Sequence, residues 1–414
     1  MTRTVDALPA ARGPMRLVSS LRYRDWRYLW CGLVTAQTGE WMDNIAINWL
    51  VWVQTGSPLA LGTVNLARGL PTMVFSLAGG VVADRVDRRT LMLSTRLGGL
   101  LATATMAALA TSGTMQLWQL YVLLALRGIT FAFDSPARGS LVGDLVPRSD
   151  LTNAVALHSA VFNASRMIGP AIAGVLIGLT GAPFVLWLNA AGFLVVIWTL
   201  FMMRVPARRA PRPGTSAWGT FVEGLSYVRR QPVVLMLMLT GIVPFLLGQP
   251  YQSMLPVFAT DVFDVGPQGL GLLSSGAATG SLIGAFVMSA RGDFPRKGLV
   301  MMLGLIGFGG FILLFALTPW VLLAVLLLFL AGASQQLYST TNSTLVQIIV
   351  PTEYRGRVLG VHQLDRGFIP IGAFLIGAIA EGGGAPLATA LMGGCLALVG
   401  FLLIFVIPRM RGLD

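Results

Sequence analysis

Long apolar segments separated by short polar ones repeat along the whole chain. Each apolar segment has about 20 residues or more, the length that an α-helix needs to cross the hydrocarbon core of a bilayer. Within lipid, every backbone amide must find its hydrogen-bond partner in its own segment, so all of these segments are expected to be helices. The pattern predicts an all-α membrane protein with twelve spans, at 28–53, 58–83, 90–111, 117–138, 152–179, 183–203, 232–258, 268–290, 298–317, 320–345, 357–380 and 386–407.

Composition and charge agree with this pattern. The chain is 55% hydrophobic, with a mean hydropathy of +0.74, and a soluble protein of 414 residues has no way to hide so much apolar surface. Its net charge of +12 lies almost wholly in alternate connections between spans, which argues against nucleic acid as a partner and follows the positive-inside rule. Both termini are therefore expected in the cytoplasm, and residues 1–27 are interpreted as a retained tail because they lack a signal-peptide pattern.

The polar segments divide the chain into two halves. We predict an N-terminal tail (1–27), a six-helix bundle (28–203), a cytoplasmic linker with an amphipathic stretch (204–231), a second six-helix bundle (232–407) and a short tail (408–414). His158 and His362, the two histidines of the chain, are 204 residues apart, and Arg166 and Arg366 are 200 apart. Such offsets indicate two related, pseudo-symmetric bundles, the organisation of alternating-access transporters with a site near the bilayer midplane.

Seven charged residues fall deep within the spans, where each costs roughly 2.5–3.5 kcal/mol and needs a partner or a hydrated cavity. The third, sixth, ninth and twelfth spans contain none of them, which suggests that every third helix faces lipid. The seven residues are Glu40, Asp43, Arg68, Arg127, Arg166, Asp365 and Arg366.

The first span has a polar stripe. Gln37, Glu40, Asn44 and Asn48 follow helical spacing, and Asp43 lies beside them. Two carboxylates three residues apart repel each other in a low dielectric, which favours a proton on one of them. Proton coupling is the predicted role of both acids, and the alternative is structural pairing with Arg68, Arg127 or Arg166.

The remaining charged residues within the spans are predicted to act in proton coupling, in gating or in the wall of the cavity. Asp365 is the third proton-coupling candidate and could also pair with one of the four arginines. Arginine stays protonated, so Arg166 and Arg366 are predicted to be ion-pair partners in gating, with substrate contact as the alternative. Further cavity candidates, besides the four arginines and Asn44, are Gln249, Tyr251, Gln335, Tyr338 and Asn342.

Several kinds of chemistry have no supporting residues. The chain contains no G-x-x-x-x-G-K-[ST] loop for ATP, and its single lysine, Lys297, lies in "PRKG". It also contains no cluster of Cys and His for a metal and no His-based catalytic set, and Cys31 and Cys395 both lie inside spans. We therefore expect no enzyme activity, no cofactor and no metal, and an ion gradient as the energy source.

The stretch "GGVVADRVDRR" (79–89) lies between the second and third spans. With the twelve spans and the central loop, it resembles the major facilitator superfamily, whose signature here is G-x-x-x-D-R-x-G-R-R. Gly80, Asp84, Arg85, Arg88 and Arg89 match, whereas Asp87 replaces the second glycine of the signature. The resemblance implies that Asp84 latches the two halves on the cytoplasmic side, facing the N-terminal end of span 11.

The stretch "RMIGPAIAG" (166–174) is similar to the antiporter motif of the same superfamily, with Gly169, Pro170 and Gly174 as matches. "WLVWVQTGSPLALG" (49–62), "ARGLP" (67–71) and the segment 135–157 look most like bacterial siderophore exporters and macrolide-efflux proteins. The resemblance implies export and leaves the substrate open.

These observations together predict a proton-coupled exporter of amphipathic small molecules, drug-like or siderophore-like, in the bacterial cytoplasmic membrane. Its expected partners are the lipid bilayer, a small-molecule substrate and protons, and it is expected to act as a monomer. One alternative keeps the fold and changes the cargo to a lipid or lysolipid. Another is a non-transporting membrane receptor or scaffold.

Overall fold

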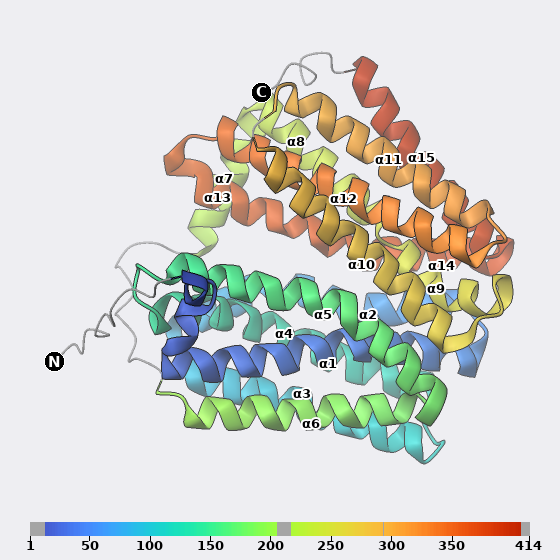
Figure 1. Ribbon diagram of the computed structural model, residues 1–414, viewed down its shortest axis with the longest axis horizontal. Helices are drawn as coiled ribbons and strands as arrows, with labels where there is room; N and C mark the ends of the chain where they lie inside the picture. Colours follow the sequence, from blue (N-terminus) through green and yellow to red (C-terminus); the bar gives the residue numbers. More distant parts are fainter. Residues whose placement is uncertain (1–12, 205–216, 293, 407–414) are drawn as a thin grey trace.

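The computed structural model describes residues 13–204, 217–292 and 294–406, which are almost entirely helical (Figure 1). The first half begins with the 3₁₀ helix η1 (Gly13–Arg22) and continues with α1 (Arg24–Thr55), α2 (Pro58–Arg85), α3 (Arg88–Thr111), α4 (Leu117–Leu145), α5 (Leu151–Thr180) and α6 (Ala182–Met202). The amphipathic helix α7 (Ala217–Arg230) connects it to the second half. That half comprises α8 (Pro232–Val243), η2 (Pro244–Gly248), α9 (Tyr251–Val257), η3 (Phe258–Val262), α10 (Gly266–Arg291), α11 (Lys297–Leu317), α12 (Val321–Ile349), α13 (Thr352–His362), η4 (Gln363–Phe368), α14 (Ile369–Gly383) and α15 (Ala385–Val406).

Ten helical segments in the described part of the chain are long and apolar enough to cross a membrane. Pro232–Val262 and Thr352–Gly383 each count as one of them although they contain several helical types. The other two predicted spans are α1 and α2, which have 32 and 28 residues. Both are long enough to cross, but they contain Glu40, Asp43 and Arg68 and are correspondingly less apolar.

Prolines do not interrupt the seventh span. Pro244 begins one π-helical turn, η2, and a second, η3, follows α9, so that the helix continues through residue 262. A π-helical turn shifts the backbone hydrogen bonds by one residue, and this accommodates a proline that has no amide hydrogen to donate. The eleventh span changes to a 3₁₀ turn at η4, which contains Asp365 and Arg366.

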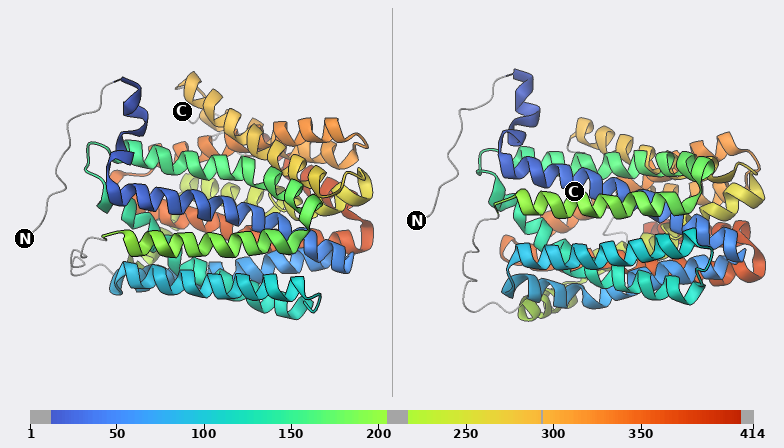
Figure 2. Two further views of the ribbon diagram at one scale, coloured as in Figure 1. Left: turned by 60° about the horizontal axis from the view of Figure 1, so that its bottom comes forward. Right: turned by 90° about the horizontal axis from the view of Figure 1, so that it is seen from below.

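The helices form two bundles, α1–α6 and α8–α15, that converge at one end (Figures 1 and 2). We call this the far end, and the opposite end, where α1 begins, the terminal end. At the far end α5 packs along α10 and α2 packs along α14. Glycines allow this approach: a β-carbon at Gly174 would lie 2.5 Å from the Pro267 carbonyl oxygen, and one at Gly377 would lie 2.6 Å from that of Pro58.

Polar contacts reinforce the far end. The Glu381 carboxylate on α14 accepts hydrogen bonds from Ser57 Oγ (2.8 Å) and from the Leu59 amide (3.0 Å) at the start of α2. Trp52 Nε1 on α1 donates to Thr260 Oγ1 on η3 at 2.8 Å. A carboxylate at a helix N-terminus is favourable for the helix dipole, so the contact between α2 and α14 is electrostatic as well as steric.

At the terminal end, α7 lies against α13. Tyr227 stacks on Tyr354 with ring centroids 4.5 Å apart, and Glu223 pairs with Arg357 at 3.0 Å. The predicted amphipathic stretch of the linker thus packs on the C-terminal bundle. Within that stretch, the side chain of Trp218 lies outside those that the structure describes.

The start of the described chain is hydrogen-bonded to the residue that precedes α5. Asp150, before α5, accepts hydrogen bonds from Ser19 (2.8 Å), Tyr23 (2.9 Å) and Arg22 (2.7 Å). Burial alone would raise the pKa of Asp150, but these three hydrogen bonds together hold the pKa below its usual value of 3.8. A lowered folded-state pKa means that the contribution of Asp150 to stability is complete above that usual value and is lost as the pH falls through the lowered pKa.

We expect Asp150→Asn to release this N-terminal segment at neutral pH, because the amide replaces a charged acceptor of three hydrogen bonds. Trypsin should then cleave within Gly13–Arg22 several-fold faster than in the wild type. The control is Asp144→Asn, which alters an acid of the same end that pairs with Arg88 instead. Equal cleavage rates in the Asp150 variant and the wild type would contradict the role of Asp150.

Candidate functional site

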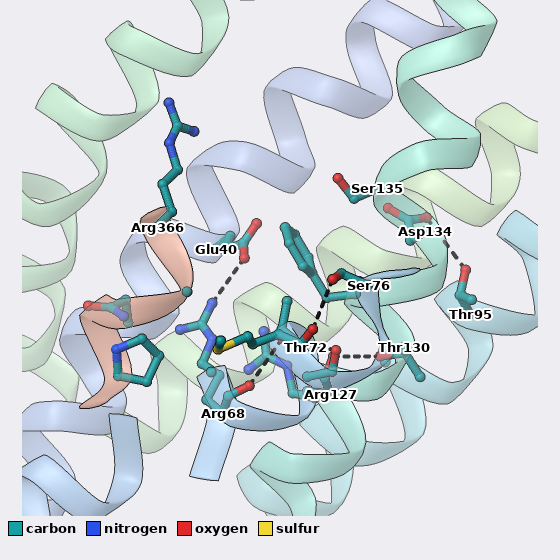
Figure 3. Close-up of a pocket in the computed structure, with 18 of the residues that line it drawn as sticks. Glu40, Arg68, Thr72, Ser76, Thr95, Arg127, Thr130, Asp134, Ser135 and Arg366 are labelled. Carbon is teal, nitrogen blue, oxygen red and sulfur yellow. Dashed lines mark hydrogen bonds and ion pairs between the residues drawn. The ribbon is translucent and has the colours of Figure 1, made fainter. Parts of the chain in front are cut away.

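A cavity of about 630 Å³ lies between the two bundles (Figure 3). By their positions along α1 and α2, Asn44 and Asn65 are the lining residues deepest in the cavity, nearest the far end, and the wall continues along Ser76, Ser135 and Val196 towards the terminal end. Contacts between α2 and α14 and between α5 and α10 close it at the far end. The size is within the usual range for small-molecule sites.

Two acids of the predicted polar stripe on α1 pair with different arginines. Glu40 accepts a hydrogen bond from Arg68 at 2.9 Å, and Asp43 accepts one from Arg127 at 2.5 Å. The Glu40 side chain is 31% exposed and lines the cavity, whereas that of Asp43 is 0% exposed. Each acid thus has its own counter-charge, and of the two Glu40 is the one that the cavity reaches.

Amides extend the stripe between α1 and α2. Asn48 donates to the Asn44 carbonyl oxygen at 2.8 Å, and Asn65 donates to Asn48 Oδ1 at 3.0 Å. Asn44 and Asn65 both line the cavity, next to Glu40. The deepest part of the cavity is therefore polar and is lined by hydrogen-bonding groups of the N-terminal bundle.

A second ionic cluster was missed by the sequence analysis. Arg96 on α3 donates to both oxygens of Asp134 on α4, at 3.1 and 2.6 Å, and Arg138 lies 3.7 Å from the same carboxylate. The i, i+4 spacing of Asp134 and Arg138 is visible in the sequence, but nothing in the sequence pairs Arg96 with them. Arg96 and Asp134 line the cavity, and so do Asn189 and Phe193 of α6. The expectation that the third and sixth spans face only lipid is thereby corrected, since each of these helices also has a cavity-facing side.

We expect Asp134→Asn to lower the thermal stability of the purified protein strongly. It would leave two buried guanidinium groups without their carboxylate, and removal of one partner from a buried pair costs roughly 3–5 kcal/mol. Asp144→Asn is the matched control, because the Asp144 side chain is 48% exposed and a surface pair contributes about 1 kcal/mol or less. Unfolding temperatures of the two variants within one degree or so of each other would contradict a structural role for the cluster.

Arg166 and Arg366 do not make the ion pairs predicted for them. Arg166 on α5 lies over the Trp41 ring, 5.8 Å from its centroid, and borders a small second hollow that shares the lining residue Asn44 with the main cavity. Arg366 on η4 lines the main cavity and has no carboxylate partner among the described residues. Asp365, the other candidate for these pairs, instead binds His362 Nδ1 at 2.7 Å.

The other predicted cavity residues are distributed between cavity wall and core. Tyr251 borders the second hollow beside Arg166. Tyr338 and Asn342 are buried within the C-terminal bundle and donate to the Thr240 and Leu237 carbonyl oxygens of α8, at 2.7 and 3.2 Å. Gln249 and Gln335 line neither the main cavity nor the second hollow, and Gln249 Oε1 accepts a hydrogen bond from Gln252.

The charged turn between α2 and α3 is held by local contacts. Arg88 pairs with Asp144 on α4, and Arg89 donates to the Phe201 carbonyl oxygen at 3.0 Å. Asp87 caps α3 by accepting from the Thr90 amide at 2.9 Å, which gives the departure from the family signature a structural purpose. Gly80 and Arg85 are at the end of α2, and the side chain of Asp84 lies outside those that the structure describes.

The antiporter-like motif lies at two close helix contacts, of α5 with α1 and of α5 with α10. Gly169 packs on the Cβ of Trp41 in α1, and the Pro170 carbonyl oxygen and Gly174 face Gly271 of α10 across the bundle interface. Larger side chains at Gly169 and Gly174 would separate these helices. The motif therefore serves the contact that closes the far end.

Comparison with known proteins identifies the family. The family described as transmembrane secretion effector matches residues 17–414. The chain belongs to this major facilitator family. The transporter is 28% identical to the staphyloferrin A transporter of Staphylococcus aureus, over 86% of this chain and 89% of that protein. It is 27% identical to the multidrug efflux pump Tap of Mycolicibacterium fortuitum, over 92% and 95%.

The structure also resembles solved transporter structures. A bacterial homologue of the human lysosomal transporter Spinster, in an inward-facing and unoccupied conformation, superposes on the transporter with a TM-score of 0.74. The two are 16% identical, and the match covers 94% of this chain and 98% of that one. The transporter is thus an all-α, multi-pass membrane protein of the major facilitator fold and not an enzyme.

Proposed function

We propose that the protein is a proton-coupled exporter that moves amphipathic small molecules by alternating access. One observation carries the proposal: the Glu40–Arg68 pair lies in a cavity that is closed at one end and bounded by both bundles. A carboxylate that faces the substrate space can exchange a proton for a substrate contact. The relatives named for efflux and for siderophore transport support small molecules, rather than a lipid, as cargo.

The positive-inside rule assigns the terminal end to the cytoplasm, because that end carries most of the arginines, including Arg85, Arg229 and Arg355. The cavity then opens inward, towards the substrates of an exporter, in the bacterial cytoplasmic membrane. The Gly80–Arg89 turn lies at the same end, where the family resemblance assigns it a gating role in the opposite, outward-open state.

Glu40 is the proposed proton carrier of this state. Protonation removes its charge and frees Arg68, which changes the charge of the cavity by one unit while the bundle core remains intact. Asp43 has no exposed side-chain surface, and Asp134 is 5% exposed and shared by two arginines, so neither competes with Glu40 for a proton from the cavity. Asp365, which is bound to His362, is a second candidate within the C-terminal bundle.

The test uses the purified protein in liposomes. An imposed pH gradient, with uptake of siderophores, macrolides and fluorescent dyes as the readout, should drive the accumulation of at least one amphipathic compound. Each proton that crosses 100 mV supplies roughly 2.3 kcal/mol, which is enough for a more than tenfold concentration ratio. Equal uptake with and without the gradient across the whole set would refute proton coupling.

A further inference from the structure

The charges around the cavity are not balanced. Four carboxylates lie at depth in the described part of the chain, and each has a basic partner: Glu40 with Arg68, Asp43 with Arg127, Asp134 with Arg96 and Arg138, and Asp365 with His362. Arg166 and Arg366 are left without an acid. Because a guanidinium does not lose its proton, these two positive charges persist at every pH of interest.

The two unpaired charges belong to opposite bundles. Arg166 is on α5 and Arg366 is on η4, at positions related by the internal repeat. Figure 3 shows Arg366 on η4, with its guanidinium pointing away from the Glu40–Arg68 pair. The hollow beside Arg166 and the cavity beside Arg366 share Asn44 as a lining residue, so the two arginines border neighbouring spaces.

The surroundings favour an amphipathic ligand. Beside Arg166 the hollow is lined by apolar side chains, among them Trp41, Ile45 and Leu255. The main cavity, which Arg366 lines, also has the apolar side chains of Met73, Phe131 and Leu364 in its wall. Apolar walls lower the local dielectric, and this strengthens both the repulsion between the two guanidinium groups and their attraction for an anion.

We infer that the cargo is an amphipathic organic anion whose carboxylate binds between Arg166 and Arg366. Arginine binds carboxylate through two parallel hydrogen bonds, and the apolar part of the molecule would occupy the wall next to it. Because one guanidinium comes from each bundle, a bound anion replaces repulsion between the bundles with attraction and so favours their approach at the terminal end. The inference specifies the substrate class of the exporter proposed above and rests on that proposal.

The first experiment compares two dyes that share a ring system. Carboxyfluorescein is an organic anion, and a rhodamine methyl ester is its cationic counterpart. Fluorescence anisotropy with the purified protein in detergent should give tighter binding of the anion. Arg366→Gln and Arg166→Gln should each weaken that binding by about tenfold or more, since each removes a charge-assisted hydrogen bond, whereas Arg366→Lys should retain most of it.

The second experiment does not depend on the choice of ligand. Asn44 is replaced by cysteine after Cys31 and Cys395, both exposed, are replaced by alanine. The rates of modification by an anionic and by a cationic methanethiosulfonate are then measured, relative to the rates with a free thiol in solution. The anionic reagent should be favoured by about tenfold or more, and the preference should largely disappear in the Arg366→Gln background.

Two results would overturn the inference. One is binding of the cationic dye as tightly as the anionic dye, and the other is a modification ratio near one in the wild type. Both experiments are done in detergent without a gradient, so their failure would leave proton-driven transport untouched. Conversely, loss of gradient coupling with intact anion preference would refute the proposed function alone.

Discussion

Glu40→Gln is expected to abolish transport driven by a pH gradient while substrate binding persists. Of the two acids on α1, Glu40 is the one with a cavity-exposed side chain, and glutamine retains its size and its ability to accept a hydrogen bond from Arg68. Glutamine carries no titratable proton, so proton movement down the gradient is no longer coupled to substrate transport. Accumulation in liposomes should fall by tenfold or more, to the level without a gradient, whereas exchange of labelled for unlabelled substrate should continue.

The matched control is Glu223→Gln, which makes the same chemical change on the 59% exposed side chain that pairs with Arg357 on α13. It should leave accumulation close to the wild-type value. Asp43→Asn provides a further contrast, because it leaves the buried Arg127 guanidinium without a counter-charge. This variant should lower thermal stability before it affects coupling. Normal gradient-driven accumulation by Glu40→Gln would remove Glu40 from the proposed mechanism.

Gly174→Leu is expected to prevent closure of the far end and to reduce transport by at least tenfold. A β-carbon at this position would already lie 2.5 Å from the Pro267 carbonyl oxygen and 3.0 Å from Gly271 Cα, so a leucine side chain must push α5 and α10 apart. Backbone atoms on both sides leave no flexible group to give way. Labelling of Ser57→Cys by an impermeant thiol reagent from the far side should increase accordingly.

Gly310→Leu on α11 is the control for added bulk. No atom lies within 4 Å of a β-carbon built at Gly310, and its leucine should be tolerated. The pair of variants separates loss of the helix contact from a general effect of a large side chain on insertion. If Gly174→Leu transports at the wild-type rate, the contact between α5 and α10 is not part of the transport cycle.

The sequence predicted the helices of the second half and of α3–α6 within a few residues, except that α4 continues to Leu145, beyond the predicted end at 138. It did so because apolar length is a property of each segment alone. Two spans of mixed helical type, Pro232–Val262 and Thr352–Gly383, were predicted as spans although their π and 3₁₀ turns were not. Such turns depend on how neighbouring helices satisfy the backbone. The charged turn between α2 and α3 was recognised from its amino-acid sequence. The capping of α3 by Asp87, however, depends on backbone geometry that the sequence does not specify.

The sequence predicted some of the residues that line the cavity and left their pairings open. Helical periodicity places Glu40 and Asn44 on one face of α1, but it gives no rotation of α1 relative to α2 or α4. The assignment of Glu40 to Arg68 and of Asp43 to Arg127 therefore needed coordinates. For the same reason Tyr338 and Asn342, polar residues on one helical face, proved to donate to α8 inside the bundle and not to line the cavity.

The amino-acid sequence alone thus determined that the chain spans a membrane and that charged residues lie deep within its spans, and it predicted two related halves, because hydrophobicity, repeats and charge can be read from the sequence itself. Tertiary structure alone decided which charges neutralise one another, which end of the molecule is closed and which two deep arginines of the described residues remain without an acid. These depend on distances between helices that are far apart in sequence, and electrostatic energies vary steeply with such distances.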